Sequence, residues 1–474
     1  MHTSMRAGDI SFYAALAFLL GVFVANMRWS LFLLIMIVIF VAITMIVSSR
    51  ARNARNAVGI FLIATTVGTL YYHAYIHWQT AHTRIPPEKH AAFFGMIMEA
   101  PKAAGNFTML TVSLASPYAG TLDIFTTPNA DQFAYGDQIW ISGSVSTSSD
   151  LTEPPTMFLP RLRVVAEHQG FWLKEAIIKF KDMIVQKIAQ LLPVDQAALL
   201  AGIMIGTTGT VGATLKAQMD ASGTSYIVNM FGYKIAVITS GLNAALKDHM
   251  PRRALLWSTL GTVALFVFAS GGTTSALRAA IMGSFALIAR GTGRIFSART
   301  AITFSAVGMV LLNATLLTDA GFQLSFLSFL GIYYLGPPIN NFFRWKDGGL
   351  LQWKEHAMLS LSTNLAILPI IMNTFGDFSL TSFVSNVLIM IPWLAVLACG
   401  SLLIIFGFLS PVLAFCMRQI VSVLMQYELF IIHIFATITI AMPAIFGSSF
   451  AIVIYYGILI IFAHYYGTPS QENN

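Results

Sequence analysis

Long apolar segments separated by short polar turns dominate the sequence. The spans predicted from this pattern are 10–27, 30–48 and 57–76 near the N-terminus, and 223–246, 254–270, 275–290, 300–318, 321–338, 355–374, 379–407, 412–441 and 448–466 in the second half. A helix needs about 20 apolar residues to cross the hydrocarbon core of a bilayer. The pattern therefore predicts a polytopic α-helical membrane protein.

Residues 77–170 follow a different pattern, in which short alternating segments are separated by Gly, Pro, Asn and Asp. The predicted strands are 93–100, 107–114, 121–127, 137–145 and 161–166. This spacing favours one small external β-domain inserted after the third transmembrane helix, either an oligonucleotide-binding (OB)-like β-barrel or a plain β-sandwich. Five basic and eight acidic residues give this segment a charge of −3, so charge alone does not predict a DNA-binding groove there.

Residues 171–192 have apolar positions at helical spacing, with lysines elsewhere on the wheel. These lysines are Lys174, Lys179, Lys181 and Lys187. Such a helix is typical of the membrane interface, where we expect it to act as a lid or brace. Two shorter helical segments follow within 195–221, split by residues 206–212. The predicted organisation is 1–76 (three-helix membrane segment), 77–170 (external OB-like β-domain), 171–222 (interfacial amphipathic helices), 223–466 (transmembrane channel domain) and 467–474 (polar tail).

The composition agrees with a membrane protein. Of 474 residues, 56% are hydrophobic and only 10% are charged, whereas soluble domains carry roughly 25% charged residues. The mean hydropathy is +0.73. The two cysteines, Cys399 and Cys416, form no recognisable disulfide or metal-binding pattern.

Basic residues in the short loops predict the orientation of the chain. Alternate threading of the spans places four basic loops on the cytoplasmic side, as the positive-inside rule requires. Their basic residues are Arg50, Arg52, Arg55, Lys247, Arg252, Arg253, Arg290, Arg294, Arg299, Arg344, Lys346 and Lys354. The β-domain is then external. The side of the C-terminus is undecided, because 412–436 could cross the bilayer or lie in its interface.

The segment from Ser222 to Gly241 is apolar enough to enter a bilayer, yet it carries Asn229 and Lys234 near its middle. A lysine at mid-membrane costs about 2.5–3.5 kcal/mol on insertion scales, so it normally faces a partner or a wet cavity. We therefore interpret this helix as lining a path. The alternative is that Lys234 pairs inside a structural bundle.

Other polar side chains fall at comparable depths in the predicted spans. The path candidates are Thr224, Ser225, Asn229, Lys234, Arg278, Asp319, Gln323, Asn364 and Asn386. Their convergence would create a hydrated path with an outer vestibule. Unrelated buried pairs, such as Arg278 with Asp319, explain the same pattern, and spacing alone does not decide between the two.

No motif for metal-dependent hydrolysis, nucleotide binding or a nucleophilic serine occurs in the sequence, so we predict no catalytic residues, no metal and no cofactor. His433 and Glu428, in a C-terminal apolar segment, are interpreted as structural.

Several segments resemble the ComEC family of DNA-internalisation competence proteins. They are LLPVDQAALLAGIMIG (191–206), ASGTSYIVNMFGYKIAVI (221–238), TSALRAAIM (274–282), DAGFQLSFLSFLG (319–331), LSTNLAILPIIMNTFGDFSL (361–380) and the strand from Gly136 to Gly143. The resemblance covers roughly 85–410 and implies an external OB-type domain. The family-motif residues that carry over are Gly223, Thr224, Ser225, Gly232, Arg278, Asp319, Gly321, Phe322, Gln323, Ser325 and Phe326.

The sequence departs from the family pattern at three positions. Tyr226 and Lys234 stand where the family has histidines, and Phe231 stands where it has a serine, so no role of those residues carries over. The polar tail does not resemble the metallo-β-lactamase-like domain that ends longer members. The resemblance therefore implies a short form whose nuclease step comes from elsewhere.

The resemblance implies an inner-membrane channel that translocates single-stranded DNA into the cytoplasm during natural transformation. The implied partners are single-stranded DNA, membrane lipid, an external DNA receptor, and a cytoplasmic helicase or single-strand-binding proteins; the resemblance is also compatible with an oligomer. A transporter of a small anionic or lipid-linked solute is the alternative from the residues. An external enzyme acting through the β-domain is a third hypothesis, weakened by the missing metal-ligand set.

Overall fold

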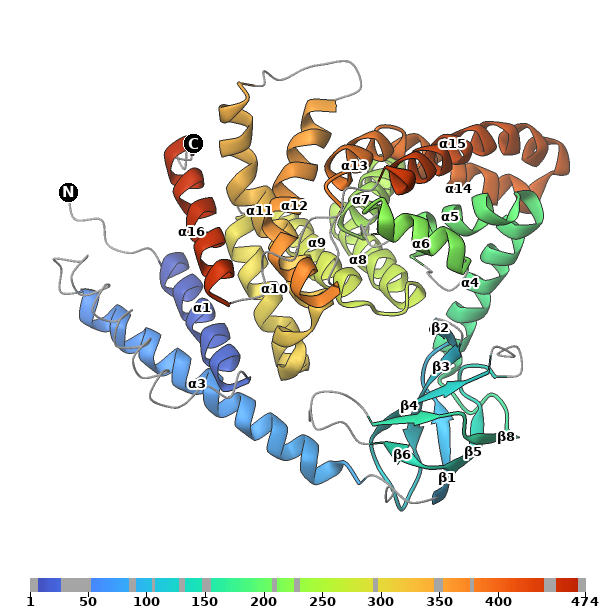
Figure 1. The fold of residues 1–474 in the computed structure, drawn as a ribbon, viewed down its shortest axis with the longest axis horizontal. Helices are drawn as coiled ribbons and strands as arrows, with labels where there is room; N and C mark the ends of the chain where they lie inside the picture. The colour runs from blue at the N-terminus through green and yellow to red at the C-terminus, as the bar shows by residue number, and fades with distance from the viewer. Residues whose placement is uncertain are drawn as a thin grey trace. The chain divides into compact units, whose positions relative to one another are not determined.

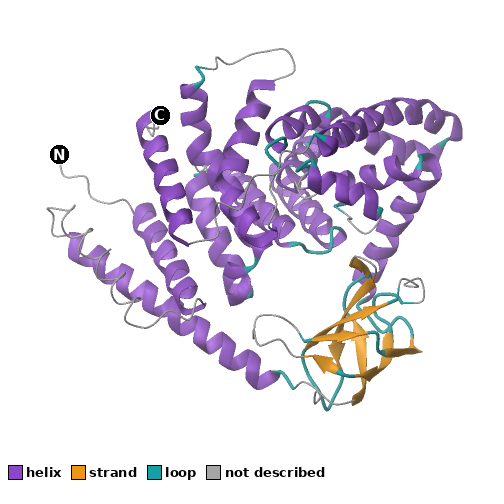
Figure 2. Ribbon diagram, in the orientation of Figure 1, coloured by secondary structure: helices purple, strands orange, loops and turns teal. Residues whose placement is uncertain are grey.

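The computed structural model describes residues 7–26, 53–84, 91–104, 107–127, 133–146, 155–206, 211–225, 231–292, 297–344, 353–375, 379–438 and 449–467. These form two compact units. The first contains 1–176, 251–260 and 280–322, and the second contains 177–250, 261–279 and 323–474. Most of the described chain is helical, and the strands are confined to one segment of the first unit (Figures 1 and 2).

Helices α1 (Ala7–Asn26) and α3 (Asn53–His82) pack closely in the first unit. A Cβ atom on Gly21 would lie 2.1 Å from the Thr65 carbonyl oxygen, so only glycine permits this approach. The Tyr72 hydroxyl donates a hydrogen bond of 2.8 Å to Asn26 Oδ1 between the same helices. The predictions of helices at 10–27 and 57–76 are confirmed, whereas the predicted span 30–48 lies outside the described residues.

The β-domain consists of one sheet. Its strands are β1 (Ala91–Ile97), β2 (Lys102–Ala104), β3 (Phe107–Leu114), β4 (Thr121–Thr126), β5 (Gln138–Gly143), β6 (Val145–Ser146), β7 (Thr156–Phe158) and β8 (Arg161–Ala166). Their order is β6-β7-β4-β3-β1-β5-β8, with β2 paired to β3. The pairing of β4 with β7 is parallel, and the other strand pairs are antiparallel.

All five predicted strands are present, because more exposed and less exposed residues alternate along each of them with period two. In β1, for example, Phe93 is 4% exposed and Phe94 is 45% exposed. Leu110, Ile124 and Ile139 lie in the core that this alternation builds. The short strands β2, β6 and β7 were not predicted. Closure of the sheet into a barrel is not seen in the pairing of the described strands.

Within the predicted span 223–246, residues 222–225 form a turn and the described helix starts only at Phe231, so the predicted start of this span is wrong. The remaining helices otherwise follow the predicted segments. They are α4 (Trp172–Leu191), α5 (Val194–Ile205), α6 (Ala213–Ala221), α7 (Phe231–Leu246), α8 (Arg252–Ala269), α9 (Thr274–Thr292), α10 (Ala298–Leu312), the 3-10 helix η3 (Ala314–Thr318), α11 (Ala320–Phe342), α12 (Trp353–Phe375), α13 (Ser382–Met390), α14 (Trp393–Leu409), α15 (Pro411–Thr437) and α16 (Ser449–Tyr466). Helices α5 and α6 confirm the two short helical segments predicted within 195–221.

The predicted span 379–407 consists of two helices in the structure. Helices α13 and α14 form it and are bent by 50° at the break between Met390 and Trp393. Pro392 lies in this break, and proline removes a backbone donor from the helical hydrogen-bond ladder. The bent pair is compatible with a broken span or with a re-entrant loop.

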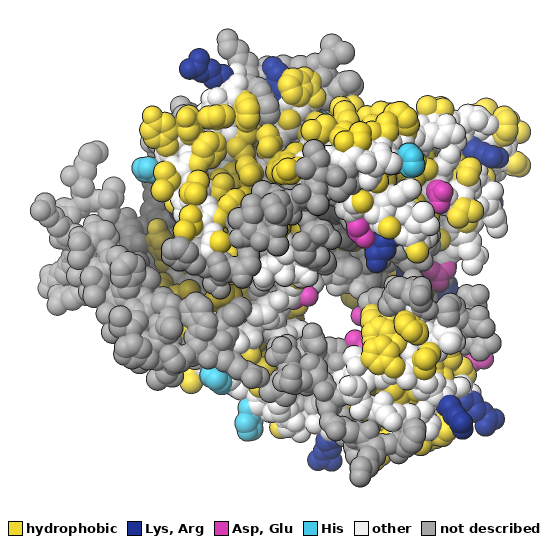
Figure 3. All heavy atoms as spheres, in the orientation of Figure 1, with side chains coloured by type: hydrophobic (Ala, Val, Ile, Leu, Met, Phe, Trp, Pro, Cys, Tyr) yellow, Lys and Arg dark blue, Asp and Glu magenta, His cyan; other side chains and the backbone are white. Residues whose placement is uncertain are grey.

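Several helices have the properties of membrane spans. Among the described residues, four helices are long and apolar enough to cross a bilayer, within 59–82, 252–269, 353–374 and 411–437, and the bent pair of α13 and α14 would be a fifth. Large apolar side chains are exposed on α15, including Val412, Phe415, Val423 and Phe430. Hydrophobic side chains also cover much of the visible helical surface in Figure 3. We conclude that the chain is a membrane protein with lipid-facing helices.

The alternation in β1 provides a matched test of the β-domain core. Replacing Phe93 with Ala should lower the stability of the sheet by about 3–5 kcal/mol, because a buried ring is lost and a cavity remains. Replacing Phe94 with Ala should change it by less than about 0.5 kcal/mol. Hydrogen exchange of β1 and β5 amides, followed by mass spectrometry on the full chain, measures both. Equal protection in the two variants would contradict the assigned register.

Candidate functional site

A buried turn at residues 222–225 packs against α13. The Ser222 and Thr224 side chains are fully buried, and their hydroxyl oxygens lie 2.8 Å apart. The Ser385 hydroxyl donates a hydrogen bond of 2.9 Å to the Ser222 carbonyl oxygen, which joins the turn to α13. Gly223 has a φ of +68°, and a Cβ atom there would lie 2.3 Å from Ser382 Cβ. Both its backbone conformation and this contact require glycine.

Helix α12 adds a second polar surface against α13. The Ser360 hydroxyl donates to the Phe383 carbonyl oxygen at 3.1 Å, and Asn364 Nδ2 donates to the Ser360 hydroxyl at 3.3 Å. Ser360 and Asn364 are both buried. We use the term polar seam for this set of hydroxyl and amide groups, which comprises Ser222, Thr224, Ser360, Asn364, Ser382, Ser385 and Asn386.

The polar seam is not satisfied by its own hydrogen bonds. Asn386 is 0% exposed, and neither Nδ2 nor Oδ1 has a hydrogen-bond partner in the described part of the chain. The buried Ser382 hydroxyl also has no partner among these residues. Such a group left unpaired costs about 1–3 kcal/mol, so it requires an explanation. An occupant that offers polar groups, such as water or a polar substrate, would remove this cost.

Lys234 lies at the carbonyl end of α5. It is 2% exposed, and its Nζ donates a hydrogen bond of 3.3 Å to the Gly202 carbonyl oxygen. The same Nζ lies 4.7 Å from the centre of the Phe231 ring. The C-terminal end of a helix carries partial negative charge, and an aromatic face attracts a cation. These contacts explain how a lysine is accommodated between α5 and α7.

Arg278 joins α9 to α11. Its Nε donates a 2.5 Å hydrogen bond to the Ser325 hydroxyl, and its guanidinium lies 5.7 Å from the ring centres of both Phe326 and Phe329. Ser325 and Phe326 are buried in α11, so the sequence GFQLSF supplies both the polar and the aromatic contacts of this arginine.

Asp319 stands immediately before α11. Its Oδ1 accepts a hydrogen bond of 2.7 Å from the Phe322 backbone N–H, which is the geometry of a helix N-cap. Phe322 is buried, Gln323 is half-buried, and Gly321 is exposed. The aspartate of this motif therefore has a local role in starting the helix.

The structure brings some of the predicted path residues together. Thr224, Asn364 and Asn386 belong to the polar seam, while the Ser225 hydroxyl donates to Asp220 Oδ1 at 2.5 Å. Lys234 and Arg278 have the contacts described above, on α7 and α9, and their role in a path stays a prediction. Asn229 lies outside the described residues.

Sequence reasoning missed all four serines of the polar seam, including Ser360, which lies one turn before the predicted Asn364 on α12. Ser382 and Ser385 lie at i and i+3 on α13, a spacing that places them on the same helix face, but serine alone carries no strong signal in an apolar helix. Ser222 directly precedes the predicted Gly223, so its position next to the motif is the signal that was available.

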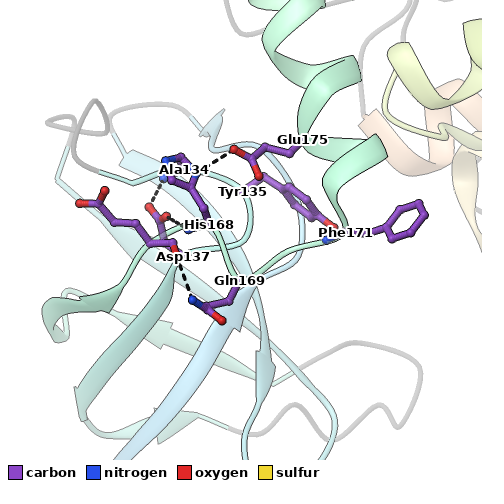
Figure 4. A network of polar contacts seen from close by, with 8 residues as sticks. Ala134, Tyr135, Asp137, His168, Gln169, Phe171 and Glu175 are labelled. Atoms are coloured by element: carbon purple, nitrogen blue, oxygen red, sulfur yellow. Dashed lines mark hydrogen bonds and ion pairs between the residues drawn. The ribbon is translucent and has the colours of Figure 1, made fainter.

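The start of α4 is fastened to the β-domain in the first unit (Figure 4). Lys174 Nζ donates to the Met98 carbonyl oxygen at 2.7 Å and lies 4.7 Å from the centre of the Tyr135 ring. His168 Nδ1 lies 2.7 Å from Glu175 Oε1. In Figure 4, His168 points toward Glu175, and Asp137 lies beside it. The contacts of Lys174 and Glu175 together anchor the start of α4 to the β-domain.

The other lysines of α4 differ in their surroundings. Lys187 Nζ lies 5.5 Å from the centre of the Phe408 ring, Lys179 is exposed, and Lys181 is half-buried. Their predicted place at the membrane interface stays a prediction. Across the described ranges, His, Cys, Asp and Glu form no group of three or more that could hold a metal ion.

Comparison with known proteins places the polar seam in a recognised region. A family model described as "Competence protein" matches residues 203–469. The "ComE operon protein 3" of Bacillus subtilis (strain 168) is 25% identical to this chain over 272 residues, which are 56% of this chain and 32% of that protein. The match thus spans about a third of the length of this relative. No solved structure matches the chain. The family match includes Lys234, Arg278 and all of the polar seam, and it excludes the β-domain.

The glycine at the turn of the polar seam has a matched control. Gly223→Ala should destabilise the protein by at least about 1–2 kcal/mol, because alanine disfavours a left-handed backbone and its Cβ would meet Ser382. Gly232→Ala should be tolerated, since no atom lies within 4 Å of a Cβ there. Thermal unfolding of both variants in detergent measures the difference. Similar unfolding temperatures would contradict the assigned packing of the turn on α13.

Proposed function

Because the chain belongs to the Competence protein family, we propose that it is an inner-membrane channel that passes single-stranded DNA into the cytoplasm during natural transformation. The observation that carries the proposal is the polar seam, whose buried amide and hydroxyl groups lie among the helices of a membrane protein. Within this seam, Asn386 has no hydrogen-bond partner among the described residues. Polar side chains inside a membrane domain normally face a substrate pathway or a wet cavity.

The chemistry of the polar seam suits a polymer that must keep moving. Its groups are neutral hydroxyls and amides, which can exchange hydrogen bonds with phosphate oxygens and base edges without holding them strongly. Conduction requires binding that is favourable enough to enter and weak enough to leave. Lys234 and Arg278 would add positive charge that offsets the phosphates.

We also propose that the β-domain is an OB-type barrel on the outer side of the membrane. Two residues separate β7 from β8, while β7 pairs in parallel with β4 and β8 pairs antiparallel with β5. If β7 and β8 are two halves of one bent strand, the order β1-β3-β4-β7/β8-β5 returns to β1 through the β1–β5 pair. This order supports a closed five-strand barrel. The basic inner loops support the external placement.

The proposed partners follow from the proposed transport. An external receptor would deliver the strand, and a cytoplasmic helicase or single-strand-binding proteins would draw it inward. The β-domain and α4 would brace the entrance, because Lys174 ties α4 to the sheet.

Deleting the gene and then adding fluorescently labelled DNA to the cells tests this function. The label should stop outside the cytoplasmic membrane, and a plasmid copy of the gene should restore entry. Entry of the label at the normal rate in the deleted strain would contradict the proposal. If DNA entry is normal and uptake of a labelled small anion is lost, the protein is a transporter of small anionic solutes instead.

A single substitution in the polar seam should separate stability from transport. Asn386→Leu should leave the free energy of unfolding unchanged or raise it by up to about 1–3 kcal/mol, because an unpaired buried amide is removed. In the complemented strain, the same variant should lower DNA entry at least tenfold, because an apolar side chain interrupts the path. Asn364→Leu is the control, and it should destabilise the protein because Asn364 bonds to Ser360. Normal entry with Asn386→Leu would remove Asn386 from the path.

A further inference from the structure

Helix α15 carries a carboxyl group in an apolar environment. Glu428 is 1% exposed, and neither Oε1 nor Oε2 has a hydrogen-bond partner among the residues that the structure describes. An ionised carboxylate buried without a partner is strongly disfavoured, so such a group normally takes up a proton or meets a cation. The burial of this carboxyl group therefore needs a chemical explanation, whereas the sequence indicated only a structural role for Glu428.

Glu428 lies at the level of the break between α13 and α14. Ser410 joins α14 and α15, which pack against each other as an antiparallel hairpin. Trp393 begins α14, and Glu428 lies in α15, each about five helical turns from this connection. The Tyr427 hydroxyl donates a hydrogen bond of 3.2 Å to the Leu388 carbonyl oxygen near the end of α13. This bond places the neighbouring Glu428 beside the break.

The side of α15 that carries Glu428 faces an apolar core. Val421, Met425 and Ile432 precede and follow Glu428 at helical spacing, and all three are buried in one cluster with Ile389 and Trp393. The indole Nε1 of Trp393 is buried and, like the Glu428 oxygens, has no described hydrogen-bond partner. The break therefore combines a carboxyl group and an indole donor in surroundings that exclude water.

The other titratable groups on α15 and on the helices packed against it are more exposed than Glu428. The helices packed most extensively against α15 are α14, α6, α13 and α5. Their titratable residues are Cys399 on α14, Lys216 and Asp220 on α6, and Asp195 on α5, while α13 has none; α15 itself adds Cys416, Arg418, Tyr427 and His433. All of these are exposed except Cys399, which is half-buried. His433 lies beside Gln218, with 3.5 Å between Nδ1 and Nε2.

We infer that Glu428 is a proton-binding site that controls the break between α13 and α14. A proton moves from hydronium in the solvent to a carboxylate oxygen, so one O–H bond of hydronium breaks and the O–H bond of the carboxylic acid forms. In the protonated form the neutral acid fits the apolar core that the structure shows. In the ionised form the carboxylate requires water or new donors, which the break can admit by moving. A metal cation is a weaker candidate, because such ions need several oxygen ligands and the side chains around Glu428 are apolar.

This inference does not rest on the proposed function, because proton binding is measured without DNA. Infrared difference spectra of the full-length protein in lipid bilayers, recorded while the pH is raised in sodium-free buffer, follow the carboxylic-acid C=O band. We expect a band that is present at neutral pH and is lost at high pH. Glu428→Gln should lack this band, and the control Glu355→Gln, which removes an exposed carboxyl at the start of α12, should keep it.

Two outcomes would overturn the inference. One is a wild-type spectrum that shows no acid band at any pH near neutral, which would mean that Glu428 is ionised in the folded protein. The other is a band that disappears when sodium is added at constant pH, which would identify a metal-cation site. If Glu428→Gln fails to fold, wild-type protein labelled with carbon-13 glutamate decides, because the band must then shift to lower frequency.

Discussion

The cost of placing a hydrogen-bonding group away from water governs this molecule. Each backbone group in the membrane must bond internally, so the chain forms helices there and confines its sheet to one segment. Side chains obey the same constraint with more freedom. Asn364 and Ser360 satisfy each other, whereas Asn386 remains unpaired among the described residues. A buried amide of this kind requires a partner, and a polar occupant of the proposed path would supply one.

The same constraint explains why the cations Lys234 and Arg278 have close partners, whereas the amide of Asn386 has none among the described residues. Lys234 is placed at the carbonyl end of α5 and over an aromatic ring, and Arg278 is held by Ser325 and two phenylalanines. These contacts lower the cost of burying each charge. The segment 319–329, which contains the family motif GFQLSF, thus has a physical meaning in this chain, since Asp319 caps the start of α11 and Ser325, Phe326 and Phe329 contact Arg278.

Sequence reasoning succeeded where periodicity is strong and failed where it is absent. The alternation of 107–114 and 161–166 gave β3 and β8 with their bounds, but strands of two or three residues such as β6 and β7 are too short to alternate. The break at Pro392 was missed because proline does not by itself end a membrane helix: Pro369 lies inside α12. The charged path candidates were visible, whereas the serines of the polar seam look ordinary until α13 is placed beside the 222–225 turn.

The central claim is that water and substrate reach the polar seam inside the membrane domain. Cysteine accessibility tests it directly, in a full-length protein whose Cys399 and Cys416 have been replaced by serine. We expect Ser382→Cys to react with a water-soluble thiol reagent and single-stranded DNA to slow this reaction. Val384→Cys, on the exposed side of the same helix, should stay unreactive because lipid covers it. Failure of Ser382→Cys to react, or a reaction rate that DNA leaves unchanged, would contradict the account.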